Sequence, residues 1–206
     1  MTDPNVPSNQ WDDATPSSLL VRVKEQNPVA WDRLVALYGP LVYKWCRQAG
    51  LQAADAEDVG QEVFRAVARR IGAYHHDREA DTFRGWLRTI TRNKIRDWAR
   101  HRPPERPGLL WVARMRRARK ESWDVPELDD KAAAAERSFV YLRALDLIRE
   151  DFQERTWQAF WQVTVDGVPS ADVAVDLDMS LNAVYLARSR VLRRLRQEFE
   201  GLLDAQ

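Results

Sequence analysis

The sequence predicts an all-α protein, and three observations support this fold class. Apolar residues recur at intervals of three and four, the strong helix formers Ala, Leu, Arg and Glu are abundant, and the 206 residues include only 8 glycines. Segments with the alternating pattern of β-strands are almost absent. Helices are expected near residues 17–26, 28–49, 55–71, 82–102, 136–151, 154–166, 170–177 and 181–202.

Composition limits where the protein is expected to work. Residues 1–16 combine prolines with polar residues and show no helical period, which predicts a disordered tail. Cys46 is the single cysteine and lies in an apolar stretch, so it excludes an intramolecular disulfide and is expected to be a core residue. The mean hydropathy is −0.55, and every apolar run is far shorter than the roughly 20 residues of a spanning helix. Since no basic and then apolar leader precedes residue 20, a cytoplasmic protein is expected.

The helix expected at 55–71 has one apolar and one polar side. Val59, Val63 and Val67 are spaced by four and form a stripe that is expected to be buried. Five polar residues gather on the opposite side: Asp58, Gln61, Glu62, Arg65 and Arg69. Asp55 is the expected N-cap. Acids in a first turn and cations in a last turn also suit the helix dipole, so structure alone explains much of this pattern.

The helix expected at 82–102 combines an apolar stripe with a row of arginines. The stripe consists of Phe83, Trp86, Leu87 and Ile90. The opposite side holds Arg88, Arg92 and Arg96, flanked by Thr89 and Thr91. Arginines, hydroxyls and aromatics are the residue types that grip and unstack a DNA strand, so this helix is a candidate for that role. Trp98 is expected to pack rather than to stack on a base.

Residues 103–135 are expected to form a linker between two small helical domains, residues 17–102 and 136–206. The prolines between Arg102 and Gly108 cannot continue a helix. The remainder mixes a basic run with an acidic one, with room for a short helix at 109–120.

Residues 154–196 have the form of a helix-turn-helix. Ser170 is the expected cap of a short helix, a tight turn follows at Asp178 and Met179, and Ser180 is the expected cap of a long final helix. The residues expected to face outward from that helix are Asn182, Tyr185, Leu186, Ser189, Arg190 and Arg193. They are candidates for reading the major groove, and Arg188, nearer the core side, is a candidate for a flanking phosphate. A merely amphipathic terminal helix would show a similar pattern.

The net charge of +1 is an average over segregated patches. Between Arg84 and Lys120 there are thirteen cationic residues and two acidic ones, and residues 186–196 hold five arginines without an acid. Acids collect instead within 55–62 and 124–130. Basic patches favour a polyanionic partner and acidic patches a basic protein; the alternative is that they are solvated helix faces.

The sequence contains no convincing catalytic or metal-binding motif. His75 and His76 lack partners at ligand spacing, His101 stands alone, and no glycine-rich phosphate loop occurs. Neighbouring carboxylates such as Glu57 and Asp58 point apart on a helix. We therefore expect no enzyme, no metal and no cofactor.

Two segments resemble bacterial sigma factors of the sigma-70 family, specifically the small extracytoplasmic-function (ECF) type. Residues 55–64 read DAEDVGQEVF, where the family reads close to DAEDLVQEVF, and residues 83–93 read FRGWLRTITRN, where it reads close to FRAWLxxIARN. The helix at 180–196 is similar to the promoter-reading helix of the family. The resemblance implies a sigma region 2 bundle and a sigma region 4 helix-turn-helix, joined by a flexible linker.

The resemblance also implies a function, that of a transcription initiation factor that binds core RNA polymerase, directs it to specific promoters and assists promoter melting. The residues implied to meet the clamp helices of the polymerase are Asp58, Gln61, Glu62 and Arg65. Those implied for the minus-10 region of promoter DNA are Arg84, Arg88, Thr89, Arg92 and Arg96, with the loop at 72–81 capturing an unstacked base. Those implied for the minus-35 region are Asn182, Tyr185, Leu186, Arg188, Ser189, Arg190 and Arg193. An anti-sigma protein is a further expected class of partner.

Two other interpretations stay open at this point. An autonomous helix-turn-helix regulator would use the C-terminal segment but would leave residues 55–93 unexplained. A helical enzyme would need a convergent polar pocket, for which the sequence offers no credible nucleophile, metal set or cofactor loop.

Overall fold

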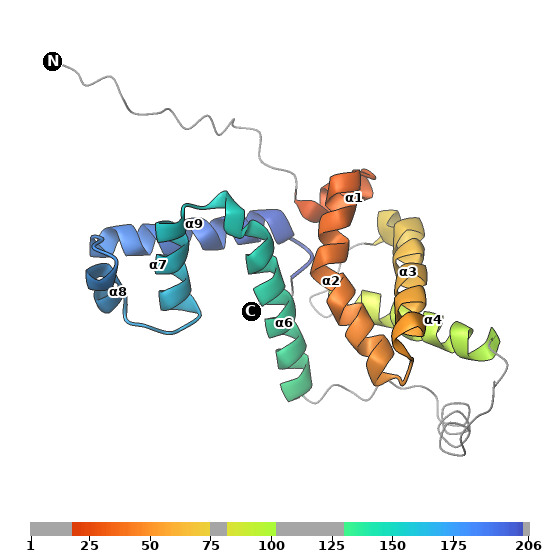
Figure 1. The fold of residues 1–206 in the computed structure, drawn as a ribbon. Coiled ribbons are helices and arrows are strands. Elements are labelled where there is room, and N and C mark those ends of the chain that lie inside the picture. Colours follow the sequence, from red (N-terminus) through yellow and green to blue (C-terminus); the bar gives the residue numbers. More distant parts are fainter. Residues whose placement is uncertain (1–17, 75–81, 102–129, 204–206) are drawn as a thin grey trace.

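The computed structural model describes residues 18–74, 82–101 and 130–203, and within these ranges every regular element is a helix (Figure 1). The α-helices are α1 (Leu19–Lys24), α2 (Pro28–Gln48), α3 (Ala53–Arg70), α4 (Phe83–His101), α6 (Asp130–Ile148), α7 (Glu154–Thr164), α8 (Ser170–Asp176) and α9 (Leu181–Phe199). Two short 3-10 turns are η1 (Ile71–Ala73) and η2 (Arg149–Asp151). The predicted all-α class is confirmed. The predicted tail, the short helix at 109–120 and most of the loop at 72–81 lie outside the described residues.

Helices α1 to α4 form a bundle around α2. The predicted stripe of α3 is buried, with Val59 3% exposed and Val63 and Val67 fully covered. Four aromatic side chains close the bundle where α2, η1 and α4 meet: Tyr38, Tyr74, Phe83 and Trp86. Trp98 also packs against this core, as expected for a tryptophan at helical spacing.

Helices α7, α8 and α9 form the helix-turn-helix at the other end of the molecule (Figure 1). The side chains of Ala159, Val173 and Val184 are fully covered and form a small core shared by the three helices. The turn between α8 and α9 contains Asp178 at φ 47°, a left-handed conformation that aspartate tolerates better than most residues. Arg155 of α7 fixes this turn, because its Nε donates a 2.9 Å hydrogen bond to the carbonyl of Leu177.

Helix α6 connects the two ends of the molecule. It packs against α2 on one side and α9 on the other, and Figure 1 shows it between them. Its buried residues Val140, Ala144 and Ile148 belong to the same apolar cluster as the cores of α2 and α3. The described halves of the chain therefore share one continuous hydrophobic core.

Three local predictions were wrong. Helix α3 is capped by Gln52 rather than Asp55, because two alanines, the best helix formers, extend it at its N-terminus. Helix α8 begins at Ser170, with Pro169 as N-cap, since the Pro169 carbonyl accepts the first helical hydrogen bonds. Helix α6 begins at Asp130 rather than near residue 136, because a run of four alanines follows Lys131.

Candidate functional site

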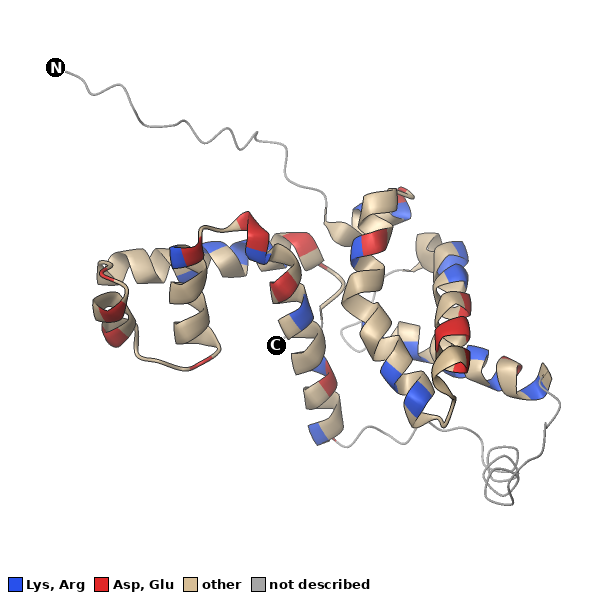
Figure 2. Cartoon of the chain, in the orientation of Figure 1, with Lys and Arg blue, Asp and Glu red and all other residues tan. Residues whose placement is uncertain are grey.

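The polar side of α3 is an open surface in the described structure. Asp58 and Gln61 are exposed, and Glu62 forms an ion pair with Arg65 one turn later. Lys94 of α4 approaches the other oxygen of Glu62 at 3.6 Å. The hydrogen bond from Arg65, aided by both positive charges, lowers the pKa of Glu62 below its ordinary value. Glu62 is therefore ionised at neutral pH, and Figure 2 shows the acidic residues of α3 in red.

The basic side of α4 is more covered than its sequence suggests. The side chains of Arg84 and Arg88 are only 12% and 21% exposed, and both lie against Glu136 of α6. Thr89 is exposed, and its hydroxyl donates to the carbonyl of Gly85 at 3.1 Å. Arg92 and Arg96 are both partly buried. The five residues predicted for the minus-10 region thus lie on one helix but differ in accessibility.

A carboxylate from α6 and an aromatic ring from α2 contact these arginines. Glu136 is 5% exposed, and one of its oxygens accepts a 2.7 Å hydrogen bond from the indole nitrogen of Trp45. Its other oxygen lies 3.0 Å from Nη1 of Arg84 and 3.7 Å from Nη1 of Arg88. The guanidinium of Arg88 also stacks over the Trp45 ring, 5.7 Å from its centroid.

The electrostatics around Arg88 show how closely the cations are gathered. Burial lowers the pKa of Arg88, and the positive charges of Arg84 and Arg92 lower it further against the opposing effect of Glu136. Arginine remains charged at neutral pH in any protein, so the lowered pKa reflects first the lost hydration of the buried guanidinium and then its repulsion from the neighbouring arginines.

The outer face of α9 is open. The residues predicted to face outward are all exposed: Asn182, Tyr185, Leu186, Ser189, Arg190 and Arg193. The large side chains of Tyr185 and Leu186 are 52% and 46% exposed, which leaves apolar surface beside the arginines. Arg188 is exposed as well, rather than packed on the core side. Its positive charge is near Tyr141 of α6, where it opposes the rise in the pKa of Tyr141 that burial causes.

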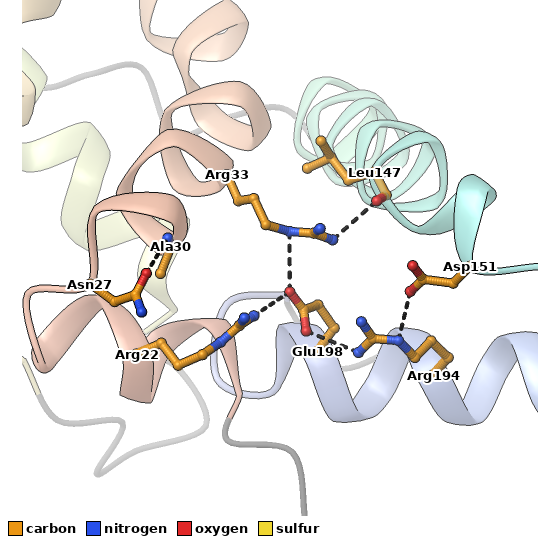
Figure 3. Close-up of polar contacts among 8 residues, drawn as sticks. All are labelled: Arg22, Asn27, Ala30, Arg33, Leu147, Asp151, Arg194 and Glu198. Atoms are coloured by element: carbon orange, nitrogen blue, oxygen red, sulfur yellow. Dashed lines mark hydrogen bonds and ion pairs between the residues drawn. The ribbon is translucent and has the colours of Figure 1, made fainter. Parts of the chain in front are cut away.

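A second buried carboxylate, Glu198 of α9, lies at the centre of a cluster of arginines (Figure 3). It is 2% exposed and pairs with Arg22 of α1 at 2.5 Å and Arg33 of α2 at 3.2 Å. Its other oxygen accepts a 2.9 Å hydrogen bond from Arg194, which also binds Asp151 at 2.8 Å. Burial lowers the pKa of Arg194, but the hydrogen bonds and charges of Glu198 and Asp151 outweigh it and hold the pKa above its ordinary value.

Sequence reasoning missed both buried glutamates, although each carried a signal. Glu136 precedes Val140, Ala144 and Ile148 at spacings of four, and so it stands on the apolar stripe of its own helix. Glu198 likewise follows the buried residues of α9 at a helical spacing. An acid on an apolar stripe indicates a buried ion pair, because an isolated buried carboxylate is too costly.

Other chemistry is limited in the described part of the chain. Cys46 is buried as predicted, and burial raises the pKa of its thiol to about 11, so it is protonated at neutral pH. Across the described ranges, no three His, Cys, Asp or Glu side chains are grouped so that they could hold a metal ion. None of the helices described is both long and apolar enough to span a membrane.

Comparison with known proteins relates one segment of the chain to a family. Residues 34–103, which include α3 and α4 with their two faces, match the family model of sigma-70 region 2. This segment is a sigma-70 region 2. The curated relatives are of the same kind: the ECF RNA polymerase sigma factor SigE of Mycolicibacterium smegmatis is 37% identical over 73 residues, and the RNA polymerase sigma factor CnrH of Cupriavidus metallidurans is 33% identical over 84 residues. The resemblance to sigma factors of the ECF type, indicated by two short motifs, is thereby confirmed for the matched segment.

The matches are confined to part of each sigma factor. They cover 35% of this chain and 27% of SigE, and 41% of this chain and 42% of CnrH. Among solved structures, a complex of RsbN and BldN is similar at 19% identity and a TM-score of 0.34, covering 86% of this chain and 97% of that one. CnrH in complex with the cytosolic domain of CnrY is similar at 24% identity and a TM-score of 0.36, covering 86% and 92%.

Proposed function

We propose that this protein is a transcription initiation factor of the ECF type, which binds core RNA polymerase, directs it to specific promoters and assists promoter melting. The observation that carries the proposal is the region 2 match over residues 34–103, because it covers an open acidic face and an arginine-rich helix in one bundle. The relatives that share this segment are named as RNA polymerase sigma factors.

The acidic face of α3 is proposed to bind the clamp helices of the polymerase. Asp58, Gln61, Glu62 and Arg65 form this face, and it projects away from the buried valine stripe of the helix. Complementary charge at a protein interface mainly favours association and suppresses wrong partners. A carboxylate face in which Arg65 and Lys94 hold Glu62 ionised suits a basic protein surface.

The two arginine-rich helices are proposed to bind promoter DNA. Helix α4 would hold the separated strand of the minus-10 region through Arg84, Arg88, Thr89, Arg92 and Arg96. Helix α9 would enter the major groove at the minus-35 region through Asn182, Tyr185, Leu186, Arg188, Ser189, Arg190 and Arg193. An exposed tyrosine and leucine among arginines suit thymine methyl groups beside phosphates. The proposed domains remain residues 17–102 and 136–206, with 103–135 as the linker.

The proposal also concerns the compartment in which the protein acts and a further partner. The protein would act without catalysis of its own, in the cytoplasm, where the polymerase and its promoters are. An anti-sigma protein is a further partner class that the proposal includes, because a factor of this kind has to be silenced when its promoters are not needed.

The direct test is reconstitution with core RNA polymerase and genomic promoter fragments. The proposal predicts that the chain co-elutes with the polymerase and starts transcription at specific sites. Absence of a complex, or operator binding without polymerase, would instead favour an autonomous regulator.

A charge-reversal variant makes this test specific to α3. Asp58→Lys with Glu62→Lys is expected to abolish co-elution, because it places like charges against a basic partner while the buried stripe is unchanged. Glu25→Lys with Asp32→Lys is the matched control, since it makes the same charge change at two exposed positions away from α3. Normal co-elution of a folded Asp58 and Glu62 double variant would remove the clamp-binding assignment.

A further inference from the structure

The C-terminal half of the chain inserts two buried acids among arginines of the N-terminal half. Glu136 of α6 lies between Arg84 and Arg88 of α4, and Glu198 of α9 lies between Arg22 and Arg33. Both carboxylates are at most 5% exposed. The polar contacts are therefore part of an interface rather than isolated surface pairs.

Hydrogen bonds from side chains to main-chain carbonyls, together with apolar packing, hold the same interface together. Arg33 donates a 3.0 Å hydrogen bond to the carbonyl of Leu147, and Arg143 donates one of the same length to the carbonyl of Ala36. The hydroxyl of Tyr38 donates to the carbonyl of Leu202. Since α2, α6 and α9 share one apolar cluster, this is a defined packing of the two halves.

The position of Glu136 matters because of what it occupies. A carboxylate and a backbone phosphate each present two anionic oxygens that accept charge-assisted hydrogen bonds from guanidinium groups. Glu136 occupies the position between Arg84 and Arg88 where a phosphate would bind. It also accepts a hydrogen bond from the indole N–H of Trp45. With 12% and 21% of their side chains exposed, the two arginines are closed to a DNA strand in this arrangement.

We infer that the described arrangement is a self-inhibited state, in which Glu136 acts as an internal substitute for a DNA phosphate. This inference rests on the proposed role of α4 in strand binding. A DNA strand reaches Arg84 and Arg88 only when α6 leaves α2 and α4. The Glu198 cluster holds α9 to α1 and α2, and so it stabilises the same closed arrangement from the other end of α6 (Figure 3).

The consequence for the free chain is reduced affinity for single-stranded DNA. When only a fraction of the molecules is open, the apparent affinity equals the affinity of the open form multiplied by that fraction. Polymerase would relieve this inhibition if it binds the open form better, since a ligand shifts an equilibrium only through its differential affinity.

The first experiment compares Glu136→Gln with the wild-type chain in binding to a fluorescein-labelled oligo(dT) strand. The glutamine keeps an oxygen for Trp45 but removes the negative charge. Affinity is expected to rise about tenfold, as for a competent state that is populated to about one tenth in the wild type. The slope of log affinity against log salt is expected to steepen by about 1.4, because two cations join the contact at about 0.7 each.

Matched controls separate this effect from a change in total charge. Glu154→Gln makes the same charge change on the exposed start of α7 and is expected to leave affinity within twofold. Adding Arg84→Ala and Arg88→Ala to Glu136→Gln is expected to remove the gain. A folded Glu136→Gln chain with wild-type affinity, or a gain that survives loss of both arginines, would overturn the inference.

A further experiment uses the wild-type chain and so does not depend on whether a variant folds. Saturation with oligo(dT) is expected to speed amide hydrogen exchange in α6 at 136–148, because the strand displaces that helix from α2 and α4. Unchanged exchange in α6 under saturation would contradict the inference.

Failure of the inference is distinguishable from failure of the proposed function. In the complex with polymerase, permanganate reactivity of unpaired thymines reports whether Arg84→Ala with Arg88→Ala impairs melting. If the arginine variant melts the promoter poorly but Glu136→Gln binds oligo(dT) with wild-type affinity, only the self-inhibited state is contradicted. If the arginine variant melts the promoter normally, the proposed role of α4 in strand binding is contradicted.

Discussion

Helices α4 and α9 share a design and differ in availability. Each has 19 residues and begins after a hydroxyl residue that accepts a 3.1 Å hydrogen bond from a first-turn amide, Thr82 from Gly85 and Ser180 from Ala183. Each carries a buried apolar stripe and a row of arginines. Of the α4 arginines, the four from Arg84 to Arg96 are partly buried, and two of them pair with Glu136. Arg190 and Arg193 of α9 are exposed.

The difference shows that an arginine row on an amphipathic helix does not establish a free surface. Whether such a row is open depends on distant parts of the chain, here α6, whose Glu136 lies 52 residues beyond Arg84. Figure 2 shows similar blue segments on α4 and α9, although their surroundings differ. Three sets of substitutions test this contrast.

The largest effect on folding is expected from Glu136→Ala. It leaves Arg84 and Arg88 without their acid in the closed arrangement. The loss of unfolding free energy is limited to about 1.4 kcal/mol, because beyond that the open arrangement, populated to about one tenth in the wild type, takes over. Urea denaturation followed by circular dichroism measures this. Glu154→Ala, on an exposed pair with Arg149, should change stability by no more than about 0.5 kcal/mol. Equal losses for the two variants would show that the α4 contacts add nothing to folding.

An intermediate effect, on DNA rather than on folding, is expected from Arg190→Ala with Arg193→Ala. Both side chains are exposed, so unfolding free energy should stay within about 0.5 kcal/mol of wild type. Binding of the polymerase complex to a duplex containing the minus-35 element should weaken, and the log-log salt slope should shrink by about 0.9 for each lost phosphate contact. Fluorescence anisotropy at several salt concentrations gives both quantities. An unchanged slope would place the groove-reading face elsewhere.

The smallest effects are expected at the two caps. Thr82→Ala and Ser180→Ala each remove one side-chain acceptor from a first-turn amide, at a cost of about 1 kcal/mol. The losses should be similar in urea denaturation, since the cap geometries match. A much larger loss at Thr82 would mean that α4 depends on its start for the packing against α6.

Much of the fold could be predicted because local patterns determine it. The valine stripe of α3, the cap at Ser180 and the left-handed turn at Asp178 all follow from spacing or residue type. Helix α6 could be predicted as a helix, but its docking against α2 depends on contacts distant in sequence. No periodicity encodes which arginines Glu136 meets.

The candidate site was predictable to a lesser degree. The outward residues of α9 could be located by angle alone, because one side of that helix is open. The burial of Arg84 and Arg88 could not be predicted in this way, since it depends on a residue from a helix distant in sequence. The roles of these residues in binding polymerase and DNA remain predictions until the variants are measured.

The most direct test of the sigma-factor assignment is promoter affinity measured with and without core polymerase at one salt concentration. A single recognition helix with few base contacts, each worth about 1 to 3 kcal/mol, should bind weakly when its second DNA-binding helix is covered. Polymerase would hold both helices at the promoter spacing and make the second contact effectively intramolecular, which raises affinity by about 100-fold or more. Tight and specific promoter binding by the isolated chain, unchanged by polymerase, would contradict the assignment.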